Sequence, residues 1–454
     1  MRSLTLPGIP NFPLLLQIEP IRRPLEGTIR PPGSKSITNR ALVLGAFSSH
    51  ARPVKLSGVL FSEDTDLMIK ALQELGFQVE VRSDYGEVNI RAASSAPVIP
   101  ASQADLFCGN SGTTMRFLTA AVSIGCGVYR LDGVPRMRER PIEDLLGALR
   151  QLGVDAVSEL GTGCPPVRVK TQGWRSNATV CIRGDVSSQF ISALLLAAPW
   201  SRAHVSLQIV GQPVSKPYIL MTLRMLEQFG AHVVLEEING LSNHTGHSQA
   251  MIIPEQNPRG IPIYTIEPDA TAATYWWAAA AITGGTVTVT GIGTDSLQGD
   301  VAFVDILQQM GCRVEKGSSQ ITVHGGELHG VEVDMNAISD TVMTLAAVAC
   351  FADSPTRISN VAHIRYKETD RISALACELR RLGVEVREFE DGLEIRPRPM
   401  RGAVLETYND HRMAMSLALI GLRVPGVVIR EPACVVKTYP HFFQDLERLC
   451  APCR

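Results

Sequence analysis

The chain has 454 residues, of which 45% are hydrophobic and 19% charged, and its formal net charge is -2. These values are ordinary for a soluble enzyme of one to three domains, and they exclude a nucleic-acid or membrane surface that acts through bulk charge. No apolar run is long enough for a membrane span or a secretion signal, so we expect a cytoplasmic protein with no nucleic-acid or membrane partner.

An internal repeat runs along the chain. Each copy contains an amphipathic helix that ends in Leu-Gly or a close variant, followed by a β-branched run. The glycine fits the position just after a helix, where a left-handed residue ends it. These helix ends lie at residues 71–76, 148–153, 225–230, 306–311, 378–383 and 445–449, the last without its glycine.

Each copy also carries a second helix that is nearly uncharged, such as residues 191–198 and 275–282. A helix that is apolar on all sides must be buried. Strand-like runs such as the alternating residues 286–289 lie between the helices, so each copy combines two helices with several short strands. Each second helix has Ser, Thr, Asp or Asn, the residue types that cap a first turn, at or beside its first residue. These helices begin at Lys35, Ser111, Ser187, Asp269, Ser339 and Asn409.

These helix openings allow two arrangements. In the first, they are six ordinary capped starts that each face solvent separately. Alternatively they converge on one cleft, where free N–H groups and positive dipole ends form a strong anion site. The clustering of cations at the openings favours convergence. These cations are Lys35, Arg40, Arg116, Arg371 and Arg412.

The simplest use of six copies is two lobes of three copies each. Junctions rich in proline and glycine lie at residues 27–33 and 261–268. If the chain crosses between the lobes once at each junction, one lobe is residues 34–266 and the other is residues 1–33 together with 267–454.

The segment from Lys367 to Arg371 packs two acids and two bases into five residues, directly before an amphipathic helix. Thr369 or Asp370 can cap that helix. Taken alone, such a segment is typical of a solvated helix start.

Cysteine and histidine show no pattern of a metal or redox site. The C-x-x-C of Cys450 and Cys453 has neither the strand–helix context of a redox pair nor two further zinc ligands, and His244 and His247 have no third ligand nearby. We therefore expect no metal and no cofactor.

Six motifs, in order, resemble those of the 5-enolpyruvylshikimate-3-phosphate synthase family. They lie at residues 32–36, 109–116, 135–142, 185–189, 367–371 and 409–414. The resemblance runs from about Gly27 to Gln444. It implies an α/β (α+β) fold of two similar lobes, each of three βαβαββ repeats as in an inside-out α/β barrel, with the active site in the cleft between the lobes.

The resemblance also implies a reaction, that of a 3-phosphoshikimate 1-carboxyvinyltransferase. Such an enzyme moves the enolpyruvyl group of phosphoenolpyruvate onto the 5-hydroxyl of shikimate 3-phosphate and releases phosphate, on the way to chorismate and the aromatic amino acids. It implies a monomer whose first lobe mainly binds shikimate 3-phosphate, while the second binds phosphoenolpyruvate and carries the acid–base residues.

The family's binding residues map onto this chain by motif position. Those implied for shikimate 3-phosphate are Lys35, Ser36, Arg40, Ser187, Ser188, Gln189, Ser215, Tyr218, Asp340, Lys367 and His363. Those implied for phosphoenolpyruvate are Lys35, Asn110, Gly112, Thr113, Arg140, Gln189, Arg371, Arg412 and Lys437. His363 departs from the family, which often has asparagine there.

Addition followed by elimination needs groups that move protons at C3 and at the attacking hydroxyl. The resemblance implies Glu368 for C3 and Asp340 for the hydroxyl, with Lys35 as a third catalytic residue. Nearby cations keep a carboxylate ionised, whereas burial raises its pKa, and the sequence leaves both outcomes open. Gly112 leaves room for glyphosate, a phosphoenolpyruvate mimic, so we expect competitive inhibition.

Two rival interpretations remain, one a related enzyme and the other a binding module without catalysis. The related UDP-N-acetylglucosamine enolpyruvyl transferase has a mobile loop with a reactive cysteine, and residues 136–142 of this chain contain none. A phosphate-binding module that had lost catalysis would not need two acid–base carboxylates such as Asp340 and Glu368. An assay of phosphate release separates catalysis from binding alone.

Overall fold

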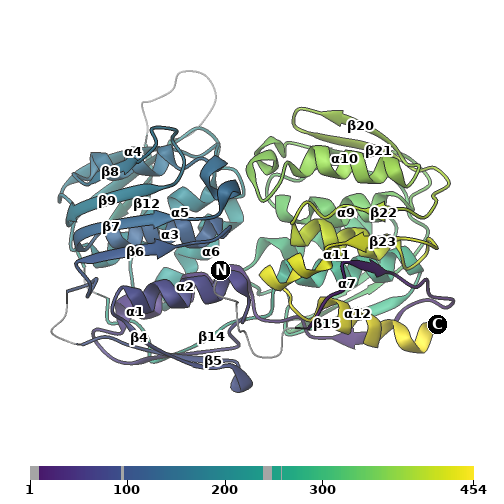
Figure 1. The fold of residues 1–454 in the computed structure, drawn as a ribbon, viewed down its shortest axis with the longest axis horizontal. Coiled ribbons are helices and arrows are strands. Elements are labelled where there is room, and N and C mark those ends of the chain that lie inside the picture. The colour runs from purple at the N-terminus through teal and green to yellow at the C-terminus, as the bar shows by residue number, and fades with distance from the viewer. Residues whose placement is uncertain (1–9, 94–96, 239–247, 257) are drawn as a thin grey trace. The chain divides into compact units, whose positions relative to one another are not determined.

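The computed structural model describes residues 10–93, 97–238, 248–256 and 258–454 (Figure 1). His244 and His247 lie outside the described residues, as do residues 1–9. The chain divides into two compact units, which we call unit 1 (Met1–Pro32 and Glu267–Arg454) and unit 2 (Gly33–Ile266). The first boundary differs by one residue from the expected one, because Gly33 belongs to unit 2.

Within its described residues, unit 2 contains three four-stranded sheets of one design. In each sheet two parallel strands are followed by two strands paired antiparallel. In spatial order the strands are β14 (Ile263–Thr265), β3 (Val54–Ser57), β5 (Glu87–Arg91) and β4 (Gln78–Arg82); β6 (Gln103–Phe107), β7 (Cys126–Asp132), β9 (Val167–Gln172) and β8 (Asp155–Ser158); and β10 (Ala178–Arg183), β11 (Val205–Val210), β13 (Ser248–Ile253) and β12 (Val234–Ile238).

Unit 1 repeats the design twice and then varies it, again within its described residues. The strands of the first two sheets, in spatial order, are β16 (Arg313–Lys316), β17 (Gln320–His324), β15 (Thr286–Thr290) and β2 (Glu26–Ile29); and β18 (Glu332–Asp334), β19 (Thr356–Ser359), β21 (Gly392–Arg396) and β20 (Glu385–Phe389). The third sheet has only β1 (Leu15–Gln17), β23 (Val428–Arg430) and β22 (Val404–Leu405).

The predicted α/β fold of repeated βαβαββ units is therefore confirmed, with one variation. The third sheet of unit 1 contains no antiparallel hairpin among the described residues. Its parallel pair β22–β23 is completed instead by β1 from the start of the chain, which pairs antiparallel with β23 (Leu15 opposite Arg430).

The first strands of two repeats are exchanged between the units. Strand β2 directly precedes the first helix of unit 2, yet it pairs in parallel with β15 of unit 1, with Glu26 opposite Thr286. Conversely, β14 directly precedes Ala270–Thr283, the first helix of the segment Glu267–Arg454 of unit 1. It nevertheless pairs in parallel with β3 of unit 2, with Ile263 opposite Lys55. In both cases the strand belongs to one unit and the helix that follows it belongs to the other. The chain therefore crosses between the units directly after β2 and directly after β14.

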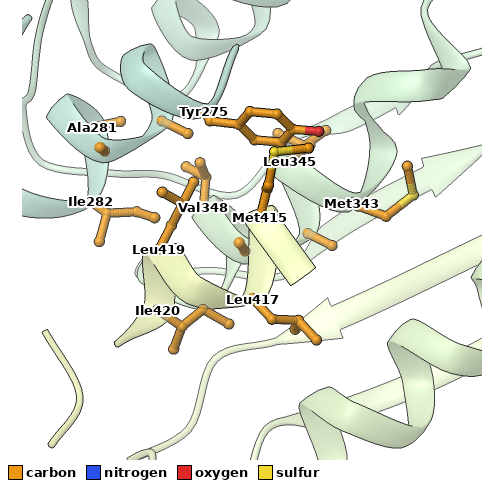
Figure 2. Packing of buried hydrophobic residues seen from close by; sticks show 14 of the residues in the cluster. Tyr275, Ala281, Ile282, Met343, Leu345, Val348, Met415, Leu417, Leu419 and Ile420 are labelled. Atoms are coloured by element: carbon orange, nitrogen blue, oxygen red, sulfur yellow. The ribbon is translucent and has the colours of Figure 1, made fainter. Parts of the chain in front are cut away.

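The nearly uncharged helices form the interior of each unit, as a helix without a polar face must. They are α1 (Lys35–Ser48), α3 (Gly112–Ser123) and α5 (Ser188–Ala197) in unit 2, and α7 (Ala270–Thr283), α9 (Val342–Ala349) and α11 (His411–Ile420) in unit 1. Every residue of α7 is buried. Figure 2 shows α7, α9 and α11 packing through side chains such as Tyr275, Leu345 and Met415.

The amphipathic helices bury one face against the sheets and end as their sequence predicts. They are α2 (Glu63–Glu74), α4 (Glu143–Gln151), α6 (Lys216–Gln228), α8 (Phe303–Gln309), α10 (Arg371–Arg381) and α12 (Phe442–Cys450). The glycine that follows the first five of these helices is left-handed in every case, with φ from 77° at Gly230 to 110° at Gly311. The chain reverses there at little steric cost, because glycine has no Cβ.

No helix in the described part of the chain is long and apolar enough to cross a membrane. The thiols of Cys450 and Cys453 are both buried at the end of α12, unbonded to each other. Burial raises the pKa of Cys450 to about 12.

Candidate functional site

Arg371 is the centre of a buried ion-pair cluster in unit 1. It is the first residue of α10, and only 1% of it is exposed. Its Nε donates to Asp410 Oδ2 at 2.8 Å and its Nη1 to Asp340 Oδ1 at 3.1 Å, while its Nη2 donates to Glu368 Oε2 at 3.0 Å. A single guanidinium thus joins carboxylates from three separate segments of the chain.

Further cations surround the two outer carboxylates. Asp340 also accepts a hydrogen bond from Arg412 Nη2 at 2.8 Å, and Lys367 Nζ lies 3.8 Å from its other oxygen. Glu368 lies 3.3 Å from Lys437 Nζ. Together with Arg371, these cations give each carboxylate of the cluster at least one positively charged neighbour.

Helix starts and short 3₁₀ turns hold these side chains in place. Asp410 caps α11 by accepting from Arg412 N at 2.9 Å, which fixes Arg412 in the first turn. Asp340 lies in the 3₁₀ turn Ser339–Thr341, which leads into α9 in place of a side-chain cap. Lys437 ends the 3₁₀ turn Pro432–Lys437. Of the two predicted caps of α10, Thr369 and Asp370, it is Asp370 that caps the helix by accepting from Ser373 N at 3.1 Å.

Two titratable groups border this cluster. His363 Nε2 lies 2.8 Å from Ser339 Oγ, and burial, helped by the charge of Lys367, lowers the pKa of His363 to about 4. Burial, helped by the charge of Asp340, raises the pKa of Asp300 to about 6, and Thr271 Oγ1 donates to its carboxylate. His363 is therefore a neutral hydrogen-bonding group at neutral pH.

In unit 2, two buried arginines meet over Gly112, the first residue of α3. A Cβ placed on Gly112 would lie 2.3 Å from Arg116 Nη1 and 2.5 Å from Arg140 Nη2. Arg116 is 4% exposed and Arg140 only 3%. Two guanidiniums beside the N-terminal N–H groups of a buried helix make a site that suits an anion.

Neutral oxygens hold these arginines in position. Arg140 Nη1 donates to the main-chain oxygen of Asn110 at 3.0 Å and to its side-chain oxygen at 3.3 Å. Arg116 Nη1 donates to Gln189 Oε1 at 2.9 Å, and Gln189 Nε2 donates to Thr113 Oγ1 at 3.4 Å. The predicted residues Asn110, Gly112, Thr113, Arg140 and Gln189 therefore form one connected group.

Arg40 is a further buried cation of unit 2. Its Nε donates to Thr222 Oγ1 at 2.8 Å, and its Nη1 donates to the main-chain oxygen of Ser36 at 2.9 Å. Its Nη2 donates to Ser192 Oγ and to the main-chain oxygen of Tyr218, and all these acceptors are neutral. Because it is 2% exposed, burial lowers the pKa of Arg40 to about 10.

The remaining predicted residues of unit 2 also lie at helix starts. Lys35 opens α1, and its Nζ lies 3.3 Å from Asp64 Oδ2 of α2. Ser187 caps α5 by accepting from Gln189 N, and Ser188 is the first residue of that helix. Ser215 precedes α6 in a left-handed conformation with φ 51° and is 3% exposed.

Sequence reasoning gave Asp410 and Asp64 no role in the site, and it named Arg116 only among the cations at the helix openings. Asp410 is fully buried beneath Arg371, Asp64 pairs with Lys35, and Arg116 shares the space over Gly112 with Arg140. Asp410 and Arg116 stand inside the motifs that carried the family resemblance, which was an available signal. The pairing of Asp64 with Lys35 joins two helices, and no local pattern marks it.

The chain is similar to known proteins over nearly its whole length. Residues 20–446 match the family model described as EPSP synthase (3-phosphoshikimate 1-carboxyvinyltransferase). It is 44% identical over 438 residues to the 3-phosphoshikimate 1-carboxyvinyltransferase of Nostoc punctiforme, covering 95% of this chain and 99% of that protein. The enzyme of that name from Thiobacillus denitrificans is 46% identical over 431 residues, covering 93% and 97%.

Among solved structures, the EPSP synthase of Acinetobacter baumannii has a TM-score of 0.75 and 25% identity, covering 96% of this chain and 98% of that one. The match of the family model, the two curated relatives and the shared fold agree. The chain belongs to the EPSP synthase (3-phosphoshikimate 1-carboxyvinyltransferase) family.

Proposed function

We propose that this chain binds phosphoenolpyruvate and shikimate 3-phosphate and joins them in the reaction of the family. The enolpyruvyl group moves to the 5-hydroxyl of shikimate 3-phosphate, and phosphate leaves. Unit 2 contributes most contacts to shikimate 3-phosphate, and unit 1 contributes the acid–base residues and cations for phosphoenolpyruvate. Each substrate carries a phosphate and a carboxylate, which arginine recognises with paired hydrogen bonds.

One observation carries this proposal: both acid–base candidates contact the same guanidinium. Asp340 and Glu368 are bound to Arg371 at 3.1 and 3.0 Å, and a further cation lies beside each of them. In a site that only bound anions, a carboxylate would serve only to orient the cations, as Asp410 does. A site that must also move protons needs such groups within reach of the reacting atoms.

For phosphoenolpyruvate, we assign Arg371, Arg412 and Lys437 of unit 1 as the cations that meet its charged groups. From unit 2 we add Arg140, with Gly112 allowing close approach. Lys35, Asn110, Thr113 and Gln189 complete the set. Apart from Arg140 and Lys437, which stand at the ends of 3₁₀ turns, these residues lie at or beside helix starts, where main-chain N–H groups add to side-chain charge.

For shikimate 3-phosphate, the buried Arg40 supports the start of α1, where Lys35 and Ser36 stand. Ser187, Ser188 and Gln189 at the start of α5, with Ser215 and Tyr218, supply hydroxyl, amide and main-chain donors for its phosphate and hydroxyls. Asp340, Lys367 and His363 of unit 1 are assigned to the side of the reacting hydroxyl. The low pKa of His363 makes it a neutral partner for a sugar-like hydroxyl.

The chemistry follows as two steps. In the addition, the 5-hydroxyl oxygen bonds to C2 of phosphoenolpyruvate while Asp340 takes the hydroxyl proton and Glu368 gives a proton to C3. In the elimination, Glu368 takes a proton back from C3, the C2=C3 double bond re-forms, and phosphate leaves from C2. Lys35 and the arginines stabilise the charge of the departing phosphate.

The test is release of inorganic phosphate from phosphoenolpyruvate, measured with and without shikimate 3-phosphate. We expect turnover only when both are present, with formation of the enolpyruvyl ether visible by ³¹P NMR. Phosphate release that does not depend on shikimate 3-phosphate, or no turnover with both substrates, would overturn the proposed function.

A further inference from the structure

The segment from Glu406 to Asp410 is held against helix α10 at two points. At one end, Asp410 binds Arg371 through both carboxylate oxygens, at 2.8 and 3.3 Å. At the other end, Glu378 accepts from Glu406 N at 3.0 Å and from the Tyr408 hydroxyl at 2.7 Å. Arg371 and Glu378 are seven residues apart on α10, about two turns, so they lie on the same face of that helix.

The Glu378 carboxylate is completely buried, although no substrate-binding role has been given to it. Burying a carboxylate is costly unless donors satisfy it. The Tyr408 hydroxyl and the Glu406 N–H supply such donors, and Arg381 Nε lies 3.4 Å from it. Because the buried Glu378 carboxylate is bound to the segment directly before Arg412, it fixes the position of that segment on α10.

The backbone between the two attachment points adds a second, independent observation. Thr407 O accepts from Asp410 N at 2.9 Å, and the two residues between them are left-handed, Tyr408 with φ 54° and Asn409 with φ 53°. This is the φ pattern of a type I′ turn, whose central positions favour glycine, asparagine and aspartate. Asparagine suits its position, but tyrosine does not, because a bulky side chain is disfavoured in that conformation.

We propose that Glu378 and Tyr408 are positioning residues for the phosphoenolpyruvate site. Their hydrogen bond holds the turn so that Asp410 meets Arg371 and Arg412 reaches Asp340. Tyrosine occupies the unfavourable turn position because its hydroxyl reaches Glu378. The inference rests on the proposed function only through the assignment of Arg371 and Arg412 to phosphoenolpyruvate.

The first test is Tyr408→Phe, which removes the hydroxyl and keeps the ring. We expect KM for phosphoenolpyruvate to rise about tenfold, the effect of one lost hydrogen bond to a charged group, while KM for shikimate 3-phosphate changes by less than about threefold. Glu378→Gln keeps one acceptor oxygen and should raise the same constant less than Glu378→Ala. The double variant Tyr408→Phe with Glu378→Gln should be less than additive, because both changes break one interaction.

A second variant separates positioning from turn preference. Tyr408→Asn suits the left-handed backbone better, so if the turn alone mattered it would leave both KM values unchanged and raise the melting temperature. We expect it to raise KM for phosphoenolpyruvate as Tyr408→Phe does. Val323→Ala truncates a fully buried side chain in another sheet of unit 1, and it controls for general destabilisation.

The outcomes distinguish the two proposals. If the wild-type enzyme releases no phosphate from its two substrates, the proposed function fails. The second outcome concerns an active wild type and variants that are folded. If Tyr408→Phe and Glu378→Gln both keep the wild-type ratio of KM for phosphoenolpyruvate to KM for shikimate 3-phosphate, the positioning role is overturned. An equal shift of that ratio in Val323→Ala also overturns it, because loss of stability alone would then account for the effect. All assays are run well below the melting temperature of each variant.

Discussion

Arg371 and Asp410 form a two-point ion pair that is almost sealed from water: Arg371 is 1% exposed and Asp410 not at all. Burial alone lowers the pKa of Arg371, but the charges of Asp410, Glu368 and Asp340 outweigh it and raise that pKa. The pair also links the start of α10 to the start of α11, because Asp410 is the cap residue of α11. One carboxylate thereby serves the stability of a helix and the orientation of two arginines.

Asp410→Asn should therefore cost both stability and activity. The amide keeps a cap acceptor for Arg412 N but removes the charge opposite a buried guanidinium, a change that typically costs about 3–5 kcal/mol. We expect a melting temperature several degrees lower and a higher KM for phosphoenolpyruvate. The matched control is Asp269→Asn, which alters the cap of α7 (Ala272 N to Oδ1, 2.8 Å) in the same unit. If both variants lose equal stability, the ion pair adds nothing beyond capping.

Gly112→Ala should weaken phosphoenolpyruvate binding without unfolding the protein. The added methyl would stand 2.3 Å from Arg116 Nη1 and 2.5 Å from Arg140 Nη2, so both side chains must move. They are the far ends of flexible side chains and can do so, but they then leave their places over the helix start. We expect KM for phosphoenolpyruvate to rise about tenfold or more, equivalent to about 1.4 kcal/mol of lost binding.

The control for this change is Gly147→Ala in α4. Its nearest neighbour would be Arg150 Nη2 at 3.5 Å, an ordinary contact, and alanine favours a helix. Steady-state kinetics of both variants with each substrate varied in turn provide the measurement. Equal KM values for phosphoenolpyruvate in Gly112→Ala and the wild type would show that the space over Gly112 is not used. Glyphosate, the mimic expected to compete there, should lose potency as well.

How far the sequence predicts this molecule depends on whether a feature is local. The left-handed glycines after the amphipathic helices and the caps at Ser34, Ser111 and Asp269 depend on a few neighbouring residues, so motif and composition are sufficient. The exchange of β2 and β14 is only partly local. The junctions rich in proline and glycine assign residues 26–29 and 263–265 to their units, but the parallel partners of these strands, β15 and β3, lie far away in the sequence. The completion of the last sheet by β1 is hidden for the same reason.

Within the site, the sequence identifies cations better than their partners. Lys35, Arg371 and Arg412 stand in the motifs that carry the family resemblance, so their motif positions predict that they bind substrate. The contacts that orient them, such as Asp64 with Lys35 and Glu378 with Tyr408, join residues 29 to 30 positions apart and depend on how helices pack. Packing of this kind is a tertiary property, and the hydrophobic pattern that specifies each helix does not encode it.

Stability should depend on pH through His363. Its pKa falls from 6.5 to about 4 on folding, so between these values the unfolded chain binds a proton that the folded protein does not. The folded state is then disfavoured as the pH drops through this window, by up to about 3 kcal/mol at about 1.36 kcal/mol per pKa unit. Asp300, whose pKa rises from 3.8 to about 6, acts in the opposite direction, so the total curve is flatter.

His363→Asn isolates the histidine contribution. The difference in unfolding free energy between this variant and the wild type should be constant above about pH 7 and shift in favour of the variant as the pH falls toward 4. Urea unfolding at several pH values measures it. The same experiment on His329→Asn is the control, since His329 lies exposed in unit 1 beside Asp353. A difference curve for His363→Asn that does not vary with pH would mean that this ring titrates normally in the folded protein.

Glu368→Gln tests the assignment of proton transfer at C3. Glutamine keeps the size of the side chain and an oxygen that can accept from Arg371 Nη2, which now lies 3.0 Å away, but it cannot carry a proton to carbon. General acid–base catalysis by one residue typically contributes 10²–10⁴-fold, so we expect kcat to fall by about that factor. Substrate binding, measured by calorimetry, should change far less, because the surrounding cations remain.

Two further measurements separate proton transfer from charge balance. In deuterated water, the wild-type enzyme should exchange hydrogen at C3 of phosphoenolpyruvate during turnover, because a proton is added there and then removed. Glu368→Gln should lose this exchange in proportion to kcat. Glu394→Gln, which changes a carboxylate that pairs with Arg396 on strand β21, should keep both. If Glu368→Gln turns over slowly yet exchanges C3 hydrogens at the wild-type rate, another group moves that proton and Glu368 serves only to balance Arg371 and Lys437.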